Sequence, residues 1–117
     1  MTTKNILVVD EQRFGKICTA LVELNGYGSE WASGCEDDFY QRDFERYDLV
    51  ITSYPYGRLT LGSLVGKKVA LLVLSDFACE DLMRAVEDNA NFFCLVKPVD
   101  FSCFNHVVNN LITNEVI

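Results

Sequence analysis

The chain has 117 residues and half of them are hydrophobic, which is enough to build one core without disulfide or metal support. Its net charge of -7 opposes the polyanionic backbone of DNA or RNA, so direct nucleic-acid binding is not expected. The apolar runs are too short to span a membrane and the start MTTKN lacks the features of a secretory signal, so we expect one cytoplasmic domain over residues 1–117.

Five cysteines are scattered along the chain and are never spaced as CxxC. Their odd number and wide spacing indicate neither a disulfide framework nor a zinc site, so we expect small core residues. They are Cys18, Cys35, Cys79, Cys94 and Cys103.

The first elements predicted along the chain are a buried strand and an amphipathic helix. The apolar run Ile6–Val9 is continuous rather than alternating, which is typical of a parallel strand covered by helices on both faces. Apolar residues then recur at helical spacing from Phe14 to Val22, and Gly26 offers a C-terminal stop.

The next stretch is less regular. The sequence GSEWAS predicts a short strand in which Trp31 is partly exposed. The range Cys35–Tyr47 predicts a weaker helix among many charges. Its inward-facing residues are expected to be Phe39, Tyr40 and Phe44.

The second half of the chain alternates in the same way. Between Pro55 and Lys68, three glycines each cost a helix about 1 kcal/mol relative to alanine, so any helix there is short or irregular. Strands are predicted over Leu49–Ile51, Val69–Leu74 and Phe92–Val96, and helices over Cys79–Val86 and Phe104–Ile112.

This alternation predicts a single-domain, three-layer α/β/α fold with right-handed connections. In such folds ligands collect beyond the carboxyl ends of the strands. An acidic pair, two hydroxyls, a further acid and a lysine are therefore expected to converge on one edge. They are Asp10 and Glu11, Ser53, Ser75 and Asp76, and Lys97, which precedes Pro98.

Four segments, ILVVDE, YDLVITS, ALLVLS and CLVKP, resemble in order and spacing the receiver domain of two-component response regulators. The resemblance covers essentially the whole chain and implies a flavodoxin-like (CheY-like) five-stranded parallel sheet of order 2-1-3-4-5, with a shortened third helix. It implies that Asp10 and Glu11 match the acidic pair that holds Mg²⁺. It further implies that Ser75 matches the hydroxyl switch and Lys97 the phosphate-pairing lysine. Ser53 stands where the phosphate-accepting aspartate belongs.

Ser53 changes the chemistry that the family would run. An aspartate is already an anionic nucleophile and a metal ligand, whereas a serine hydroxyl needs a base and adds little to a Mg²⁺ site. Asp10 and Glu11 are left to bind Mg²⁺ weakly, with help from a backbone carbonyl near Pro55. The family's switch aromatic falls on Cys94, which is too small for that motion, and the span from Ser53 to the next strand end is shortened.

Each of these residues also has a purely structural interpretation. Asp10 and Glu11 can cap the first helix, where negative charge meets the helix dipole. Lys97 can be a counterion to Asp10, positioned by the cis Lys-Pro peptide that the resemblance implies. The hydroxyl of Ser75 can satisfy backbone groups, and His106 lies on the polar side of the last helix without an expected role.

Three hypotheses about function follow. The first is a pseudo-receiver, not an enzyme, that keeps the fold and binds a protein partner, or a second copy, without phosphorylation. The second is an active phosphorelay receiver whose acceptor is Ser53 or a displaced acid such as Asp76. The third is a flavodoxin-like domain that binds a small anionic ligand. The sequence argues against this third hypothesis, because the first predicted strand is not followed by a glycine-rich phosphate-binding loop.

The partner surface of the first hypothesis is implied by the resemblance, since receivers usually bind partners through their fourth helix, fifth strand and fifth helix. In this sequence these are Cys79–Val86, Phe92–Val96 and Phe104–Ile112. The surface is expected to offer Arg84, Glu87, Asp88, Asn91, Asn105 and Asn109 around an apolar strip.

Overall fold

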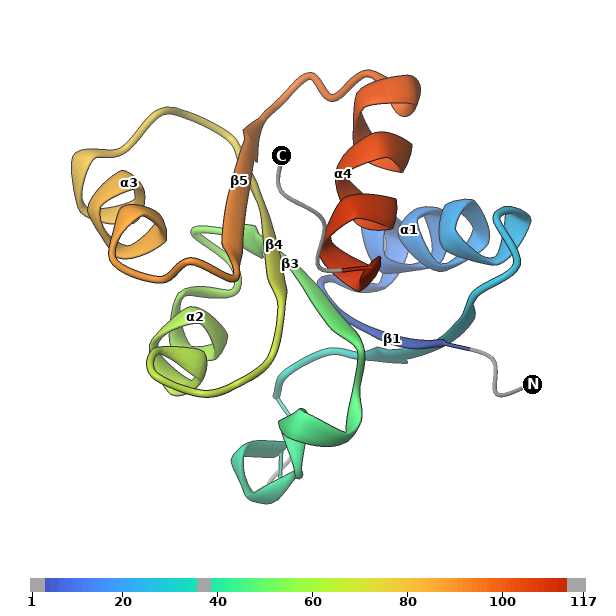
Figure 1. Cartoon of the computed structure of the whole chain (residues 1–117), viewed down its shortest axis with the longest axis horizontal. Helices are drawn as coiled ribbons and strands as arrows, with labels where there is room; N and C mark the ends of the chain where they lie inside the picture. The colour runs from blue at the N-terminus through green and yellow to red at the C-terminus, as the bar shows by residue number, and fades with distance from the viewer. Residues whose placement is uncertain (1–3, 36–38, 114–117) are drawn as a thin grey trace.

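The computed structural model describes residues 4–35 and 39–113, and its sheet has five parallel strands in the order β2-β1-β3-β4-β5 (Figure 1). This topology confirms the predicted flavodoxin-like fold. The strands are β1 (Asn5–Val9), β2 (Gly28–Ala32), β3 (Leu49–Tyr54), β4 (Leu71–Ser75) and β5 (Phe92–Val96). The α-helices are α1 (Gln12–Leu24), α2 (Arg58–Leu64), α3 (Glu80–Glu87) and α4 (Phe101–Thr113).

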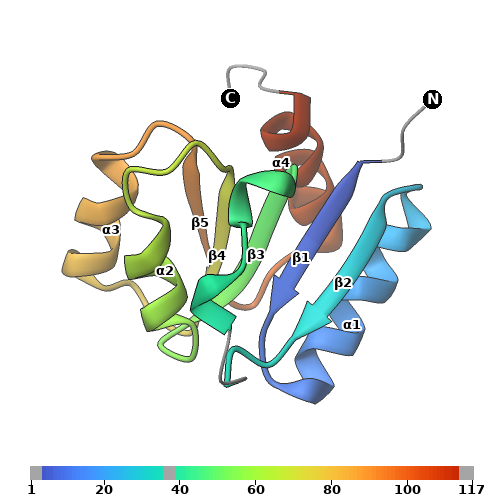
Figure 2. The same ribbon diagram turned by 90° about the horizontal axis from the view of Figure 1, so that it is seen from below.

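Helices cover both faces of the sheet, as Figure 2 shows with α1 and α4 on one side and α2 and α3 on the other. Successive side chains of a strand point to opposite faces, so each strand supplies two cores. In β1, Ile6 joins the core beneath α1 and α4, whereas Leu7 joins the core beneath α2 and α3. Burial on both faces explains why the strands appear in the sequence as continuous apolar runs.

The second crossover corrects the sequence prediction. The described part of the expected helix Cys35–Tyr47 forms two 3₁₀ turns, Phe39–Gln41 and Phe44–Arg46, and residues 36–38 lie outside the described residues. Phe39 and Phe44 are both buried, yet five positions in an α-helix would turn them roughly 140° apart. Two short turns bring both rings to the core, with centroids 5.4 Å apart, and leave Tyr40 44% exposed.

A polar cluster fixes this crossover to the edge strand β2. The hydroxyl of Tyr47 donates to Glu30 Oε2 at 2.7 Å, and guanidinium nitrogens of Arg42 and Arg46 lie 3.4 and 3.5 Å from the same oxygen. Asp43 begins the second turn by accepting a hydrogen bond from the Glu45 N–H. Side-chain contacts to β2 thus replace the regular hydrogen bonding of a helix.

The expected second helix is replaced by the two 3₁₀ turns, so the expected third helix is α2. It has seven residues, which confirms that this helix is short.

The cysteine prediction holds only in part. Cys18 is buried, Cys79 and Cys94 are partly buried, and Cys35 and Cys103 are exposed. Within residues 4–35 and 39–113, no helix has the length and apolar character to cross a bilayer.

Candidate functional site

The carboxyl ends of β1 and β3 bring Asp10 and Ser53 into direct contact. In the register of this strand pair Val9 lies beside Thr52, so the next residues of each strand are also neighbours. Ser53 Oγ donates a hydrogen bond to Asp10 Oδ1 at 2.8 Å, and both residues are buried. Ser53 therefore lies beside Asp10, as its place at the end of a neighbouring strand predicts.

Burial dominates the electrostatics of Asp10. Desolvation raises the pKa of its carboxyl group above the ordinary value, and the negative charge of Glu11 acts in the same direction. The hydrogen bond from Ser53, another from the Glu11 N–H at 2.8 Å, and the charge of Lys97 oppose this rise. Two neutral donors and a more distant cation thus compensate only partly for removing the carboxylate from water.

Glu11 performs the capping role that the sequence allowed. It is the N-cap of α1, and its carboxylate accepts the N–H of Phe14 at 2.9 Å. An acceptor at this position satisfies one of the unpaired N–H groups of the first helical turn and stabilises the helix. The exposed Glu11 carboxylate is thus engaged by the helix start, whereas the buried Asp10 carboxylate contacts Ser53.

The donor atoms at this edge do not fit a tightly held Mg²⁺, the ion that the resemblance implies. Mg²⁺ requires near-octahedral oxygen ligands, but the described residues contain no group of three acidic, histidine or cysteine side chains suited to a metal. Asp10 and Glu11 already accept hydrogen bonds, and the Pro55 carbonyl accepts the N–H of Arg58 at 3.2 Å. Weak binding through Asp10 and Glu11 stays a prediction.

Lys97 forms an ion pair with a different acid from the one expected. Its Nζ lies 3.2 Å from Asp76 Oδ1 and 4.2 Å from the ring centroid of Phe14. The charge of Lys97 also acts on Asp10, where it lowers the pKa of the carboxyl group. The expected cis peptide between Lys97 and Pro98 is present. The β4 and β5 ends therefore carry their own ion pair, next to the Asp10–Ser53 pair.

The hydroxyl of Ser75 is used locally. It donates to the carbonyl of Phe77 and accepts the Phe77 N–H at 3.3 Å. These bonds satisfy backbone groups at the end of β4, which is the structural role that the sequence left open for this residue. The hydroxyl belongs to the turn that follows β4 and forms part of its backbone hydrogen bonding.

Position 94, where the resemblance implies the switch aromatic, is occupied by a cysteine. Cys94 is partly buried against the core beneath α2 and α3, and burial raises the pKa of its thiol. Phe93 packs against the opposite core, as strand alternation predicts. Another aromatic pair lies at the same edge, since the rings of Tyr54 and Phe77 meet edge to face with centroids 6.2 Å apart.

Two residues shape the site that sequence reasoning did not single out for it. The indole N–H of Trp31 donates to the Asp10 carbonyl at 2.9 Å, which ties β2 to the end of β1. Gly57 donates its N–H to the Ser53 carbonyl at 2.6 Å, and a Cβ atom there would overlap Thr52 and Ser53. The run Pro-Tyr-Gly is a turn signal from which the role of Gly57 could have been predicted. No local sequence pattern predicts the contact of Trp31 with Asp10.

Comparisons with known proteins agree with this geometry at the level of the fold. A response regulator from Thermotoga maritima is 24% identical, with a TM-score of 0.72 over 96% of this chain and 99% of that one. A signal receiver domain from Bermanella marisrubri is 22% identical, with a TM-score of 0.76 over 95% and 99%. A CheY-like receiver domain protein from Methanospirillum hungatei is 16% identical, with a TM-score of 0.75 over 97% and 96%.

The search of protein-family models found no match, and no curated protein matches the sequence. The solved structures show that the chain has the fold of CheY-like receiver domains. With sequence identities below one quarter, they establish the architecture, and the chemistry of the strand ends has to be argued from this chain's own residues.

Proposed function

We propose that this chain is a pseudo-receiver of two-component signalling, a domain that keeps the receiver fold and binds a protein partner without being phosphorylated. One observation carries the proposal: the buried hydrogen bond between Ser53 and Asp10, at the place where the family has two carboxylates. The domain is expected to act in the cytoplasm, with no catalytic residue and no nucleic-acid partner.

The reactivity of Ser53 supports this proposal. A neutral hydroxyl attacks phosphorus only when a base removes its proton and a cation neutralises the incoming phosphoryl group. Asp10 is the contacting carboxylate, but the nearby donor set does not fit a tightly bound Mg²⁺. Ser53 is also only 5% exposed, which restricts the approach of a phosphodonor.

A second candidate function has one observation in its favour. The side chain of Asp76 is 58% exposed and lies 3.2 Å from Lys97, so this carboxylate combines access to a donor with a neighbouring cation. An active receiver would then carry an acyl phosphate on Asp76 instead of on the strand-three residue. This is the weaker proposal, because residues 4–35 and 39–113 contain no metal-binding group of acidic, histidine or cysteine side chains that could assist Asp76.

Acetyl phosphate with Mg²⁺ separates the two functions. Intact-mass spectrometry is expected to show no added phosphoryl group on the wild-type chain, whereas Ser53→Asp, which restores the family's acceptor, serves as the labelled control. Labelling of the wild type would contradict the pseudo-receiver. If Asp76→Asn then abolished that label, the displaced-acceptor receiver would be correct.

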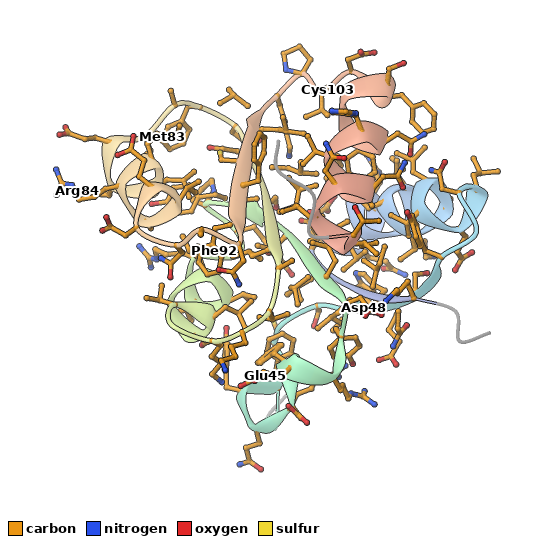
Figure 3. The ribbon with its side chains drawn as sticks, viewed as in Figure 1. Glu45, Asp48, Met83, Arg84, Phe92 and Cys103 are labelled. Atoms are coloured by element: carbon orange, nitrogen blue, oxygen red, sulfur yellow. The ribbon has the colours of Figure 1, made fainter. Side chains whose placement is uncertain are left out.

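The proposed partner surface lies over α3 and β5. Figure 3 shows Met83 and Arg84 on the outer side of α3, away from the sheet. Met83 is 39% exposed, and two further apolar side chains, Val96 at 43% and Phe77 at 50%, are exposed at the ends of β5 and β4. Glu87 and Asp88 at the end of α3 add the charge that the sequence expected.

Three residues expected on that surface make contacts elsewhere. The side chains of Asn105 and Asn109 bond to Asn25 and to the Tyr27 hydroxyl, so α4 turns them toward the end of α1. Asn91 donates to the carbonyls of Lys67 and Val69. We therefore propose a narrower partner surface than the sequence implied, centred on α3.

Paired substitutions test this surface. Met83→Glu places a charge among the exposed apolar residues Met83, Val96 and Phe77. If the partner is another protein, the variant is expected to lose it in co-purification. If the partner is a second copy of the chain, light scattering is expected to show a monomer in place of a dimer. Leu59→Glu makes the same change on α2, where Leu59 is 66% exposed, and is expected to have no effect. Equal behaviour of the two variants would place the partner on another surface.

A further inference from the structure

A cleft of about 340 Å³ opens between α1, the end of β4 and the segment that leads from β5 into α4. Among the residues that line it, all of them within the described ranges, Lys97 alone is charged. Small-molecule sites in proteins are typically clefts of about 300 to 1000 Å³ with apolar walls and a few polar groups. The apolar wall includes Phe14, Ile17, Leu21, Leu74, Val99 and Phe101.

The cleft has a partly open apolar mouth. Ile17 from α1 is 51% exposed and Phe101 from the first turn of α4 is 44% exposed. An apolar molecule between these helices would remove both side chains from water, which is favourable in proportion to the area covered. The walls therefore match the apolar body of a ligand.

Lys97 supplies a site for the polar end of that ligand. Its ammonium group has three N–H donors and lies 3.2 Å from Asp76, and the Lys97 side chain as a whole is 29% exposed. Asp76 is 58% exposed, and ion pairs of this kind contribute little to stability, so its carboxylate can turn to water when another anion arrives. Phe14, which also lines the cleft, has its ring centroid 4.2 Å from the ammonium nitrogen.

We propose that this cleft binds a small amphipathic monocarboxylate. Its apolar body lies between α1 and the start of α4, and its carboxylate accepts a hydrogen bond from Lys97. Asp10 and Ser53 do not line the cleft, and the site shares only Lys97 with the polar groups at the strand ends.

Calorimetric titration of the whole chain with octanoate tests the site, with octanol as a neutral molecule of the same chain length. Octanoate is expected to bind saturably and about tenfold more tightly than octanol, because only the anion gains a charge-assisted bond to Lys97. Lys97→Met is expected to reduce the affinity for octanoate to that for octanol and to leave octanol binding unchanged. Equal affinities for both molecules in the wild type would overturn the proposal.

Two matched substitutions on α1 locate the binding. Ile17→Glu places a negative charge in the cleft wall and is expected to abolish octanoate binding. Leu24→Glu makes the same change on the same helix at a residue that is 78% exposed and does not line the cleft, and it is expected to bind like the wild type. Binding that survives Ile17→Glu would contradict the site.

Light scattering in the same experiments tests the other occupant, a second copy of the chain. The proposal expects octanoate and Ile17→Glu to leave the molecular mass unchanged. A dimer that either of them dissociates would show that the cleft is a contact between copies and would overturn the ligand site. Circular dichroism of each variant confirms that the fold is retained.

Discussion

Asp10, which directly follows β1, and Glu30, in the neighbouring strand β2, are both acidic, yet their surroundings shift their pKa values in opposite directions. Burial raises the pKa of Asp10, whose contacting side chain is the neutral Ser53. The hydroxyl of Tyr47, followed by the charges of Arg46 and Arg42, lowers the pKa of Glu30 despite some burial. The fold thus disfavours the charged form of Asp10 and favours the charged form of Glu30.

This difference shows which of the two carboxylates the fold stabilises. The buried carboxylate of Asp10 loses its hydration, and its neutral neighbours replace that loss only in part. Glu30, in contrast, fixes the irregular second crossover to the sheet through three partners on one oxygen. Perturbing each region therefore has a different expected effect on stability.

The largest effect is expected in the crossover core. Phe44→Ala removes a side chain that is 1% exposed and contacts the Phe39 ring, and buried Phe→Ala changes cost about 3–5 kcal/mol. Urea unfolding measures this loss. Tyr40→Ala, in the same segment but 44% exposed, is the control and is expected to cost less than about 1 kcal/mol. Equal losses would show that the two turns do not hold Phe44 in the core.

The next effect sharpens the Asp10 side of the comparison. Ser53→Asp places a second carboxylate against Asp10, and an uncompensated buried charge is expected to cost about 2–3 kcal/mol without Mg²⁺. Added Mg²⁺ is expected to recover part of the loss in melting temperature, because a third carboxylate-type ligand completes a metal site. Asparagine has the size of aspartate but no charge, so Ser53→Asn is expected to lose less stability than Ser53→Asp, and its melting temperature should not respond to Mg²⁺. Identical melting curves for all three chains would contradict the contact.

A smaller effect is expected from Tyr47→Phe, which removes the hydroxyl that donates to Glu30. Because this pair is partly exposed, the loss is expected to be about 1 kcal/mol near neutral pH. The lowered pKa of Glu30 means that its stabilisation is present above the unfolded value of 4.5 and is lost as the pH falls through the folded value. The difference between variant and wild type in urea should therefore shrink in acid. A constant difference at every pH would exclude Glu30 as the partner.

The smallest effect is expected from Asp10→Asn. Since the folded pKa of Asp10 is raised, the wild type loses stability as the pH rises from about the ordinary value of 3.8 through the folded value. Asparagine keeps an acceptor for Ser53 and carries no charge, so the variant is expected to be slightly more stable at neutral pH. Urea midpoints of both chains across this range measure the difference. A variant that is less stable at neutral pH would mean that the charge of Asp10 is favourable.

The features predicted correctly from the sequence follow either from local periodicity or from a general rule of parallel sheets. The strands and the helices α1, α3 and α4 follow from apolar periodicity, and the meeting of Asp10 with Ser53 follows from the rule that parallel strands end at one edge. The second crossover failed because its two buried rings are five residues apart, and contacts to β2 decide their conformation.

The sequence predicted which residues lie at the strand ends, but it did not predict all of the contacts between them. Lys97 was expected beside Asp10 and forms its ion pair with Asp76 instead, and Asn105 and Asn109 face α1 instead of the expected partner surface. Trp31 was expected to be partly exposed, and it is, but its bond to the Asp10 carbonyl depends on how closely β2 approaches the end of β1.

The sequence by itself determined the alternation of strands and helices and the presence of a neutral hydroxyl, that of Ser53, at the end of β3, because periodicity and residue identity are properties of neighbouring positions. The tertiary structure alone paired Lys97 with Asp76, placed the Trp31 indole on the Asp10 carbonyl and formed the cleft beside Lys97. Those features depend on distances of a few ångströms between segments that are far apart in the chain, and such distances are fixed only when the helices pack on the sheet.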